Sequence, residues 1–182
     1  MARLPYVDPE TAPPAVREVF DRLPIHLNVF RMMAHAETSF RPMLQLGTSI
    51  LGKQQLSPIL RELVILRVGR LSGAEYEWTQ HVPIAKAVGA NDAQVAALER
   101  DDLADPAFDA VERAVLAFTT EVVRDVRASD ATLAAVRAHF SDREVVELLL
   151  TIGYYMMIAR LLESTGVDLD APAGARLVSS SR

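Results

Sequence analysis

The sequence contains no cysteine, and this absence excludes several kinds of chemistry. Without thiols, the chain by itself cannot form disulfides, thiolate metal sites or cysteine-based redox centres. Positive charge is also scarce, because 19 Lys and Arg residues stand against 24 Asp and Glu residues, a formal net charge of −5. This balance argues against a nucleic-acid partner, and no polybasic patch indicates binding to a membrane surface.

The sequence also lacks clear targeting or membrane-spanning segments. Residues 1–14 contain acids and four prolines but no apolar core, so they do not have the pattern of a signal peptide. The longest apolar-leaning stretch, Val145 to Leu162, is interrupted by Glu147, Gly153 and Arg160, which indicates a buried helix rather than a membrane span. We therefore expect a cytoplasmic protein with no membrane partner.

Strand signals are weak, whereas helix starts and stops are frequent. Half of the 182 residues are hydrophobic, which is enough to bury a substantial core in a single domain over residues 1–182. The pattern predicts an all-α fold, a compact helical bundle of eight or nine helices with short connections. The clustered prolines predict an extended N-terminal arm over residues 1–14, and we expect a flexible tail over residues 167–182.

Two consecutive helices are marked most clearly. Ser57-Pro58 has the pattern of an N-cap followed by proline at the first helical position. Ser72 with Glu75 has the pattern of a capping box, which predicts that the next helix begins there and runs to Val88. The two helices would form a helical hairpin.

Three ionisable residues are expected to meet across this hairpin. If the turn is centred between Leu71 and Ser72, Glu62 precedes it by as many residues as His81 follows it, so the two lie level in an antiparallel pair. Glu77 lies four residues before His81 and therefore shares its helix face. The spacing predicts that Glu62, Glu77 and His81 converge if the helix faces match.

A carboxylate beside an imidazole in an apolar setting is suited to proton transfer near neutral pH. Glu62 lies in a run of Leu, Val and Ile residues and would need a partner such as His81, while Glu77 would orient His81 and fix its tautomer. Two other interpretations remain open. The Glu77–His81 pair also fits an ordinary surface ion pair, and a metal site is disfavoured because it would contain only one imidazole.

The same residues carry a resemblance to a known family. Residues 56–89 read L-S-P-I-L-R-E-L-V-I-L-R-V-G-R-L-S-G-A-E-Y-E-W-T-Q-H-V-P-I-A-K-A-V-G. This stretch resembles the core of the carboxymuconolactone decarboxylase family, which includes the alkyl-hydroperoxidase D-like proteins. The redox branch of that family carries Glu, then Cys twelve residues later, a second Cys after three more, and His after a further four. In this sequence the four positions are Glu62, Ala74, Glu77 and His81.

The resemblance implies an alkyl-hydroperoxidase D-like helical fold and homo-oligomers, as dimers, trimers or hexamers, with a pocket near a subunit contact. Because Ala74 and Glu77 occupy both redox cysteine positions, dithiol peroxidase chemistry should be absent. The decarboxylase branch that remains needs no cofactor, and its partner would be a small-molecule substrate. Trp78, Tyr154 and His35 are further candidates for substrate-binding residues.

These considerations predict a cofactor-independent acid–base enzyme of decarboxylase or isomerase type, with no bound metal. Its substrate would be a small carboxylated or enolisable metabolite such as a lactone acid. His81 would donate or accept the proton, Glu62 would be its partner or a second acid/base, and Glu77 would orient it. The alternative is a non-catalytic oligomeric protein that binds a small molecule or serves as a scaffold, and a redox accessory protein is disfavoured by the missing cysteines.

Overall fold

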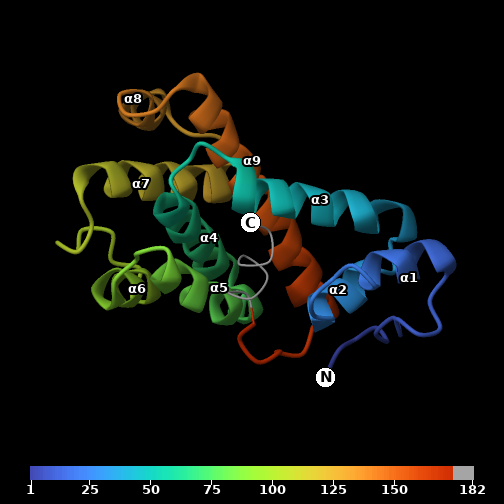
Figure 1. Ribbon diagram of the computed structural model, residues 1–182. Helices are drawn as coiled ribbons and strands as arrows, with labels where there is room; N and C mark the ends of the chain where they lie inside the picture. The colour runs from blue at the N-terminus through green and yellow to red at the C-terminus, as the bar shows by residue number, and fades with distance from the viewer. Residues whose placement is uncertain (174–182) are drawn as a thin grey trace.

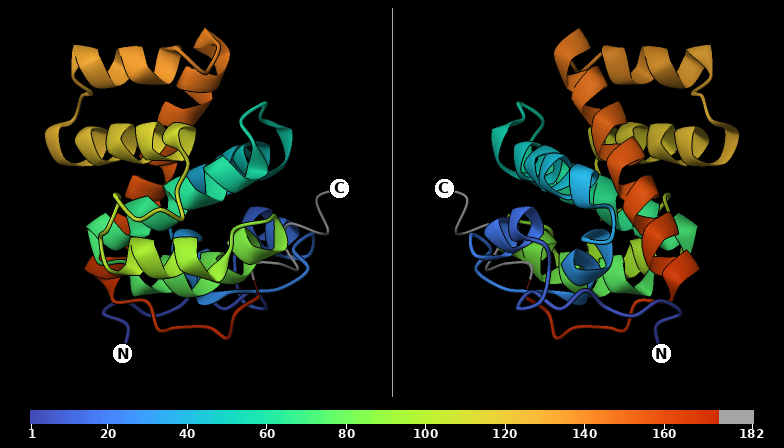
Figure 2. Two further views of the ribbon diagram at one scale, coloured as in Figure 1. Left: turned by 90° about the vertical axis from the view of Figure 1, so that its left-hand side faces the viewer. Right: turned by 90° about the vertical axis from the view of Figure 1, so that its right-hand side faces the viewer.

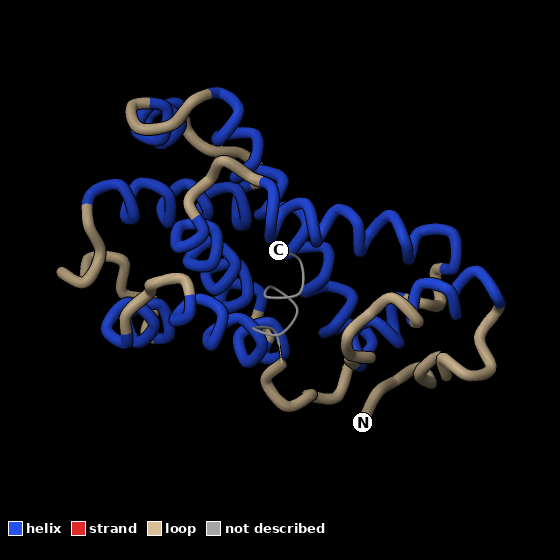
Figure 3. The backbone as a smooth tube through the Cα atoms, viewed as in Figure 1, coloured by secondary structure: helices blue, strands red, loops and turns tan. Residues whose placement is uncertain are grey.

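The computed structural model describes residues 1–173, and this part of the chain contains helices but no strand (Figure 1). The predicted all-α fold is therefore confirmed. The tube in Figure 3 shows how short most of the connecting loops are. The helices are α1 (Pro14–Phe20), α2 (Asn28–Met33), α3 (Glu37–Lys53), α4 (Pro58–Ser72), α5 (Glu75–Ala87), α6 (Asp92–Glu99), α7 (Ala110–Asp125), α8 (Asp130–Arg137) and α9 (Asp142–Thr165).

Helix α4 is the centre of the bundle. It packs against α5, α7 and α9, and the side views show α7 and α8 beside one end of α9 while α5 and α6 lie toward the other (Figure 2). Every residue from Leu60 to Gly69 is buried, so α4 has no solvent-facing side over almost three turns. A helix that is apolar nearly all round belongs in a core. Three charged residues in this run, Arg61, Glu62 and Arg67, consequently need partners.

The turn between α4 and α5 lies two residues later than the spacing predicted. Helix α4 continues through Ser72 and ends at Gly73, which adopts the left-handed conformation with φ of 65°. Ala74 is then the N-cap of α5 and makes no side-chain cap hydrogen bond. The predicted capping box of Ser72 and Glu75 is wrong, because a residue in the last turn of one helix cannot also cap the next.

The long apolar helix α9 has the length and mean hydropathy of a membrane span, with a mean hydropathy of 1.7 over an 18-residue window. Half of that window is buried inside the protein. The core helices of soluble proteins have the same property, and the buried half of α9 faces α4 and α3. Helix α9 thus packs in the core, as the polar interruptions of its apolar run predicted.

The N-terminal arm lies along its own chain. The backbone N–H of Arg3 donates to the carbonyl of Thr165 at 2.7 Å, next to the end of α9. Further along, the Arg31 guanidinium Nε donates to the carbonyl of Val7 at 3.1 Å. Residues 9–11 of the arm form a turn, in which the backbone N–H of Thr11 donates to the carbonyl of Asp8 at 3.2 Å, and α1 begins at Pro14.

Residues 167–173 are also held against the body of the protein, which differs from the flexible tail predicted for residues 167–182. The Asp170 carboxylate accepts hydrogen bonds from the backbone N–H of Asn28 and from the hydroxyl of Tyr76. The Gln80 side chain bonds the backbone of this segment, accepting from the N–H of Ala173 at 2.9 Å. These side-chain partners on α2 and α5 fix the segment. Residues 174–182 of that prediction lie outside the described residues.

Candidate active site at the α4–α5 hairpin

Glu62 is a completely buried carboxylate near the N-terminal third of α4. One carboxylate oxygen accepts a hydrogen bond from Arg61 Nε at 3.0 Å, and the other lies 2.8 Å from His81 Nδ1. The structure therefore brings Glu62 and His81 together as the hairpin arithmetic predicted. Because α4 and α5 make extensive contact, a two-residue error in the turn did not separate side chains of this length.

Arg61 belongs to the site and was not among the predicted residues. Its guanidinium is 4% exposed, and it forms an ion pair with Glu62 inside the bundle. A buried carboxylate without a countercharge is strongly destabilising, and Arg61 supplies that charge. The sequence did contain a sign of this role. Arg61 directly precedes Glu62 in an otherwise apolar run, so it must also be accommodated in the core.

His81 is oriented by Glu62. Because an ionised carboxylate can only accept, we assign the proton on Nδ1 to the bond with Glu62, which leaves Nε2 as the basic nitrogen of a neutral ring. The edge of the imidazole meets Tyr155 on α9, with ring centroids 4.9 Å apart and an angle of 88° between the planes. The ring is thus fixed in both tautomer and direction.

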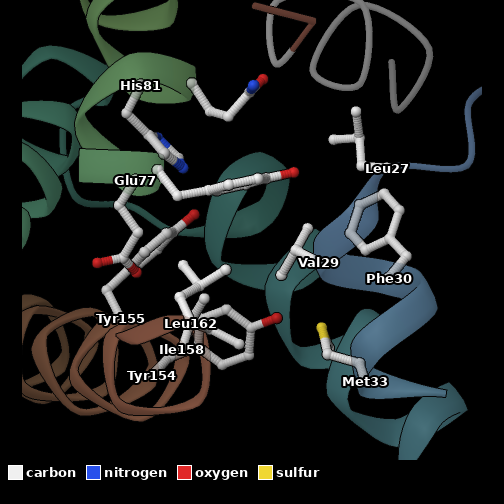
Figure 4. Close-up of a pocket in the computed structure, with 12 residues that line it drawn as sticks. Leu27, Val29, Phe30, Met33, Glu77, His81, Tyr154, Tyr155, Ile158 and Leu162 are labelled. Atoms are coloured by element: carbon white, nitrogen blue, oxygen red, sulfur yellow. The ribbon is translucent and has the colours of Figure 1, made fainter. Parts of the chain in front are cut away.

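Glu77 does not orient His81, which corrects the role predicted for it. Its side chain is turned toward α9, as Figure 4 shows, and neither carboxyl oxygen has a hydrogen-bond partner among the described residues. Burial raises the pKa of Glu77 well above its ordinary value, and the negative charge of Glu163 raises it further. Burial without a hydrogen-bond partner among the described residues therefore favours the protonated, uncharged form of this carboxyl.

Glu77 and His81 face a cavity of about 90 Å³ between α2, α5 and α9. In Figure 4 they lie with Tyr155 on one side, and Leu27, Val29, Phe30 and Met33 lie on the other. The cavity therefore has a polar side with acid–base groups and an apolar side. Its lining residues are Leu27, Val29, Phe30, Met33, Tyr76, Glu77, Gln80, His81, Tyr154, Tyr155, Ile158 and Leu162.

Tyr154 lines this cavity, and its role in binding substrate stays a prediction. Its hydroxyl donates to the carbonyl of Met43 on α3 at 3.1 Å, and burial together with the nearby Glu77 raises the pKa of Tyr154 to about 12. Burial raises the pKa of Tyr155 as well, with further contributions from Glu62 and Tyr154. Both phenols are therefore hydrogen-bond donors throughout the physiological pH range.

Two predicted substrate-binding residues lie elsewhere. Trp78 lines a different cavity with Arg70 and Glu99 and packs partly into the cluster around α6, because it projects from another face of α5 than Glu77. His35 is exposed just after α2, where its Nε2 lies 2.7 Å from the carbonyl of Pro5 in the N-terminal arm. Neither side chain reaches the Glu77–His81 cavity.

In the described part of the chain, no group of three or more His, Cys, Asp or Glu side chains is placed to hold a metal ion. The donors near the cavity are already used in another way. Glu62 bonds Arg61 and His81, and Glu77 has its carboxyl turned away from both.

The described residues form an all-α bundle with a buried Glu–His pair on consecutive helices, and comparison with known sequences finds one family that is similar to part of the chain. The model of the Carboxymuconolactone decarboxylase family matches residues 37–121, which include the whole α4–α5 hairpin. Residues 37–121, which are less than half of the 182-residue chain, are therefore similar to this family. No curated protein matches the sequence.

Solved structures share the fold over nearly the whole chain. An uncharacterized peroxidase-related protein from Ralstonia eutropha JMP134, with an alkylhydroperoxidase AhpD core, has a TM-score of 0.79 at 20% identity and covers 93% of this chain and 92% of its own. A peroxidase-related protein from Silicibacter sp. TM1040 has a TM-score of 0.78 at 19% identity, covering 100% and 96%. The debrominase Bmp8, in complex with 2,3,4-tribromopyrrole, has a TM-score of 0.76 at 16% identity, covering 99% and 98%. At these identities the likeness is one of fold.

Proposed function

We propose that this protein is a cofactor-independent acid–base enzyme that transfers a proton at a carbon atom of a small enolisable or carboxylated molecule. The observation that supports this most strongly is that two residues line one cavity: Glu77, a buried carboxyl whose pKa is raised, and His81, an imidazole held by a buried carboxylate. An acid and a base with different environments at one site are the usual requirement for such chemistry.

The roles follow from the contacts. His81 Nε2 would remove a proton from the carbon next to a carbonyl group, and the electron pair of that C–H bond would move to the carbonyl oxygen. Glu77 would donate a hydrogen bond to this oxygen as its charge develops. Glu62 would stabilise the imidazolium that forms, and Arg61 would keep Glu62 in place. Returning the proton from His81 to another carbon completes an isomerisation, whereas protonating a carbanion left by departing carbon dioxide completes a decarboxylation.

The absence of cysteine supports acid–base chemistry over thiol chemistry for this chain. Ala74 and Glu77, at the positions where the redox branch resembled by this chain carries its cysteines, are both buried. The debrominase of the same fold holds a small heteroaromatic ring, 2,3,4-tribromopyrrole. A small cyclic substrate therefore fits the dimensions that this fold accommodates.

Hydrogen exchange at carbon tests the proposal without knowledge of the full reaction. Small ketones and lactones would be incubated with the protein in D₂O, and loss of the α-proton signal followed by NMR. We expect exchange above the buffer rate for at least one compound, with His81→Gln and Glu62→Gln lowering the rate by about 10²–10⁴-fold. Glu75→Gln, an exposed acid on α5, is the matched control and should leave the rate unchanged.

Exchange that is equally fast in the His81→Gln and Glu62→Gln variants would contradict the assigned roles. No exchange with any compound, together with saturable binding, would favour the alternative of a non-catalytic small-molecule binder. We also propose that the protein is a homo-oligomer in the cytoplasm. Size-exclusion chromatography with light scattering would test the assembly, and cell fractionation would test the location.

A further inference from the structure

The outward face of α9 carries a row of apolar residues that lies outside the core. Val146, Leu150, Gly153 and Met157 are exposed, and they follow one another at intervals of four, three and four residues. Residues at these intervals lie in one row along an α-helix, which is the pattern of a helix that packs against another helix. We call these four residues the α9 seam.

The seam faces away from the side of α9 that packs in the core. Tyr155, Ile158 and Leu162 line the cavity from the inner side of the helix and are buried. Only half of the apolar window of α9 is buried, and the seam belongs to the other half. In the right-hand view of Figure 2, α9 runs unobstructed across the molecule. A contiguous exposed apolar surface of this kind marks a site of interaction with another molecule.

The seam is complementary to itself. Gly153 leaves a notch in it, because a Cβ at this position would meet nothing within 4 Å. Leu150 and Gly153 lie equally far from the midpoint between residues 151 and 152, and so do Val146 and Met157. In an antiparallel pair of α9 helices centred there, Leu150 of each copy comes level with the notch of the other, and Val146 comes level with Met157.

The charges at the ends of the seam fit the same arrangement. Residues 142–147 carry three acids and one arginine, and the arginine, Arg143, pairs with Glu147 in its own helix at 2.9 Å. Arg160 comes level with this net negative segment in the antiparallel pair. A parallel pair in register would instead place Arg160 against Arg160 and Gly153 against Gly153, with no side chain to fill the notch. The antiparallel arrangement is therefore favoured.

We propose that the α9 seam docks antiparallel onto the α9 seam of a second copy of this chain. A contact between two identical surfaces closes as a two-fold dimer. The proposed dimer rests on the homo-oligomer of the proposed function and gives it a defined surface, and it is independent of the acid–base chemistry. Because Tyr155 on the inner side of α9 lines the cavity, the dimer holds the cavity walls of the two subunits back to back.

Disrupting the seam tests the dimer. Leu150→Glu and Gly153→Arg would be compared with the unmodified protein by size-exclusion chromatography with light scattering over a dilution series. We expect each change to raise the Kd of the dimer by at least about 30-fold. Gly153→Arg keeps the test valid if Leu150→Glu fails to fold, because it places a better helix former where space is free. Leu169→Glu is the matched control and should leave the Kd unchanged, since Leu169 and Leu150 are both 49% exposed but Leu169 lies outside α9.

Cross-linking tests the antiparallel register. Because the chain contains no cysteine, variants with a single cysteine report on one contact each. Val146→Cys and Met157→Cys, co-expressed and mildly oxidised, should form a mixed disulfide dimer. Either variant alone should not, because its own counterpart lies about 16 Å away along the helix axis and a disulfide needs Cα atoms within about 7 Å.

The outcomes separate this dimer from the other proposals. A monomer at every concentration would reject both the seam contact and the homo-oligomer. An oligomer that persists in Leu150→Glu and Gly153→Arg would retain the homo-oligomer and reject the seam, and disulfide dimers of Val146→Cys alone would reject the antiparallel register. Proton exchange at carbon, measured separately, decides the acid–base chemistry whichever of these results is found.

Discussion

Replacing Glu77 with glutamine should change the pH dependence of stability in a defined direction. The carboxyl of Glu77 is 3% exposed and has no hydrogen-bond partner in residues 1–173, so burial raises its pKa well above 4.5 in the folded state. In the unfolded chain it titrates near 4.5. Between these two values the folded protein keeps a proton that the unfolded chain has lost, and folding stability must fall as the pH rises.

The magnitude follows from this difference in proton binding. Each pH unit between the unfolded and folded pKa values lowers the free energy of unfolding by up to about 1.4 kcal/mol, and Glu77→Gln removes this loss because an amide does not titrate. The new amide also needs a partner in the cavity, which offsets part of the gain at every pH by roughly 1–3 kcal/mol. The pH slope of the difference, rather than its absolute value, therefore reports on Glu77.

The measurement is urea unfolding followed by circular dichroism at pH 5, 6, 7 and 8. The stability of Glu77→Gln relative to the unmodified protein should increase with pH up to the folded pKa of Glu77. Glu75→Gln removes an exposed carboxyl from the same helical turn and serves as the control, and its difference from the unmodified protein should stay constant. A difference for Glu77→Gln that is constant over this range, or that decreases as the pH rises, would refute the reasoning.

Three further predictions concern packing and the backbone. A Cβ at Gly47 would lie 2.6 Å from the Tyr154 hydroxyl, so Gly47→Ala should displace that ring and lower the free energy of unfolding by about 1–3 kcal/mol, measured by thermal unfolding. At Gly52 a Cβ would meet nothing within 4 Å, so Gly52→Ala should raise the free energy of unfolding by roughly 0.5–1 kcal/mol in the same measurement. Val126 has φ of 70°, a left-handed conformation that strains a β-branched residue, and Val126→Gly should stabilise by about 1 kcal/mol; a loss of stability would contradict the strain. Asp170→Ala should remove two hydrogen bonds that hold residues 167–173 in place, and amide exchange in this segment, measured by mass spectrometry, should increase. Unchanged exchange would show that Asp170 does not hold the segment.

Helical periodicity predicted the central pair of the site because both partners lie on regular helices. Glu62 and His81 project from helices that pack along their length, so spacing alone was enough to place them together. The turn was misplaced because Ser72 and Glu75 match a capping box, while Gly73 ends α4 in a conformation that only the folded backbone reveals. The capping-box pattern and the glycine predict different ends for α4, and the helix ends at Gly73.

The rest of the site depends on tertiary packing and was not predictable from spacing. Val29 and Met33 come from α2, far from the hairpin in sequence, and meet it only through the cavity between α2, α5 and α9. Glu77 lies at the predicted helical position, yet its side chain turns toward α9 and not toward His81. Trp78, a predicted substrate-binding residue, lines a different cavity because it projects from another face of α5 than its neighbour Glu77.

The burial of α4 from Leu60 to Gly69 has a consequence for how the proposed activity would be lost. Glu62 lies within the run from Leu60 to Gly69, in which every residue is inside the core, rather than on a surface loop that can open independently. Amide exchange in such a segment generally requires global unfolding, so we expect Glu62 to lie in the most slowly exchanging unit of the fold. On heating or in denaturant, inactivation should coincide with the cooperative unfolding transition rather than precede it.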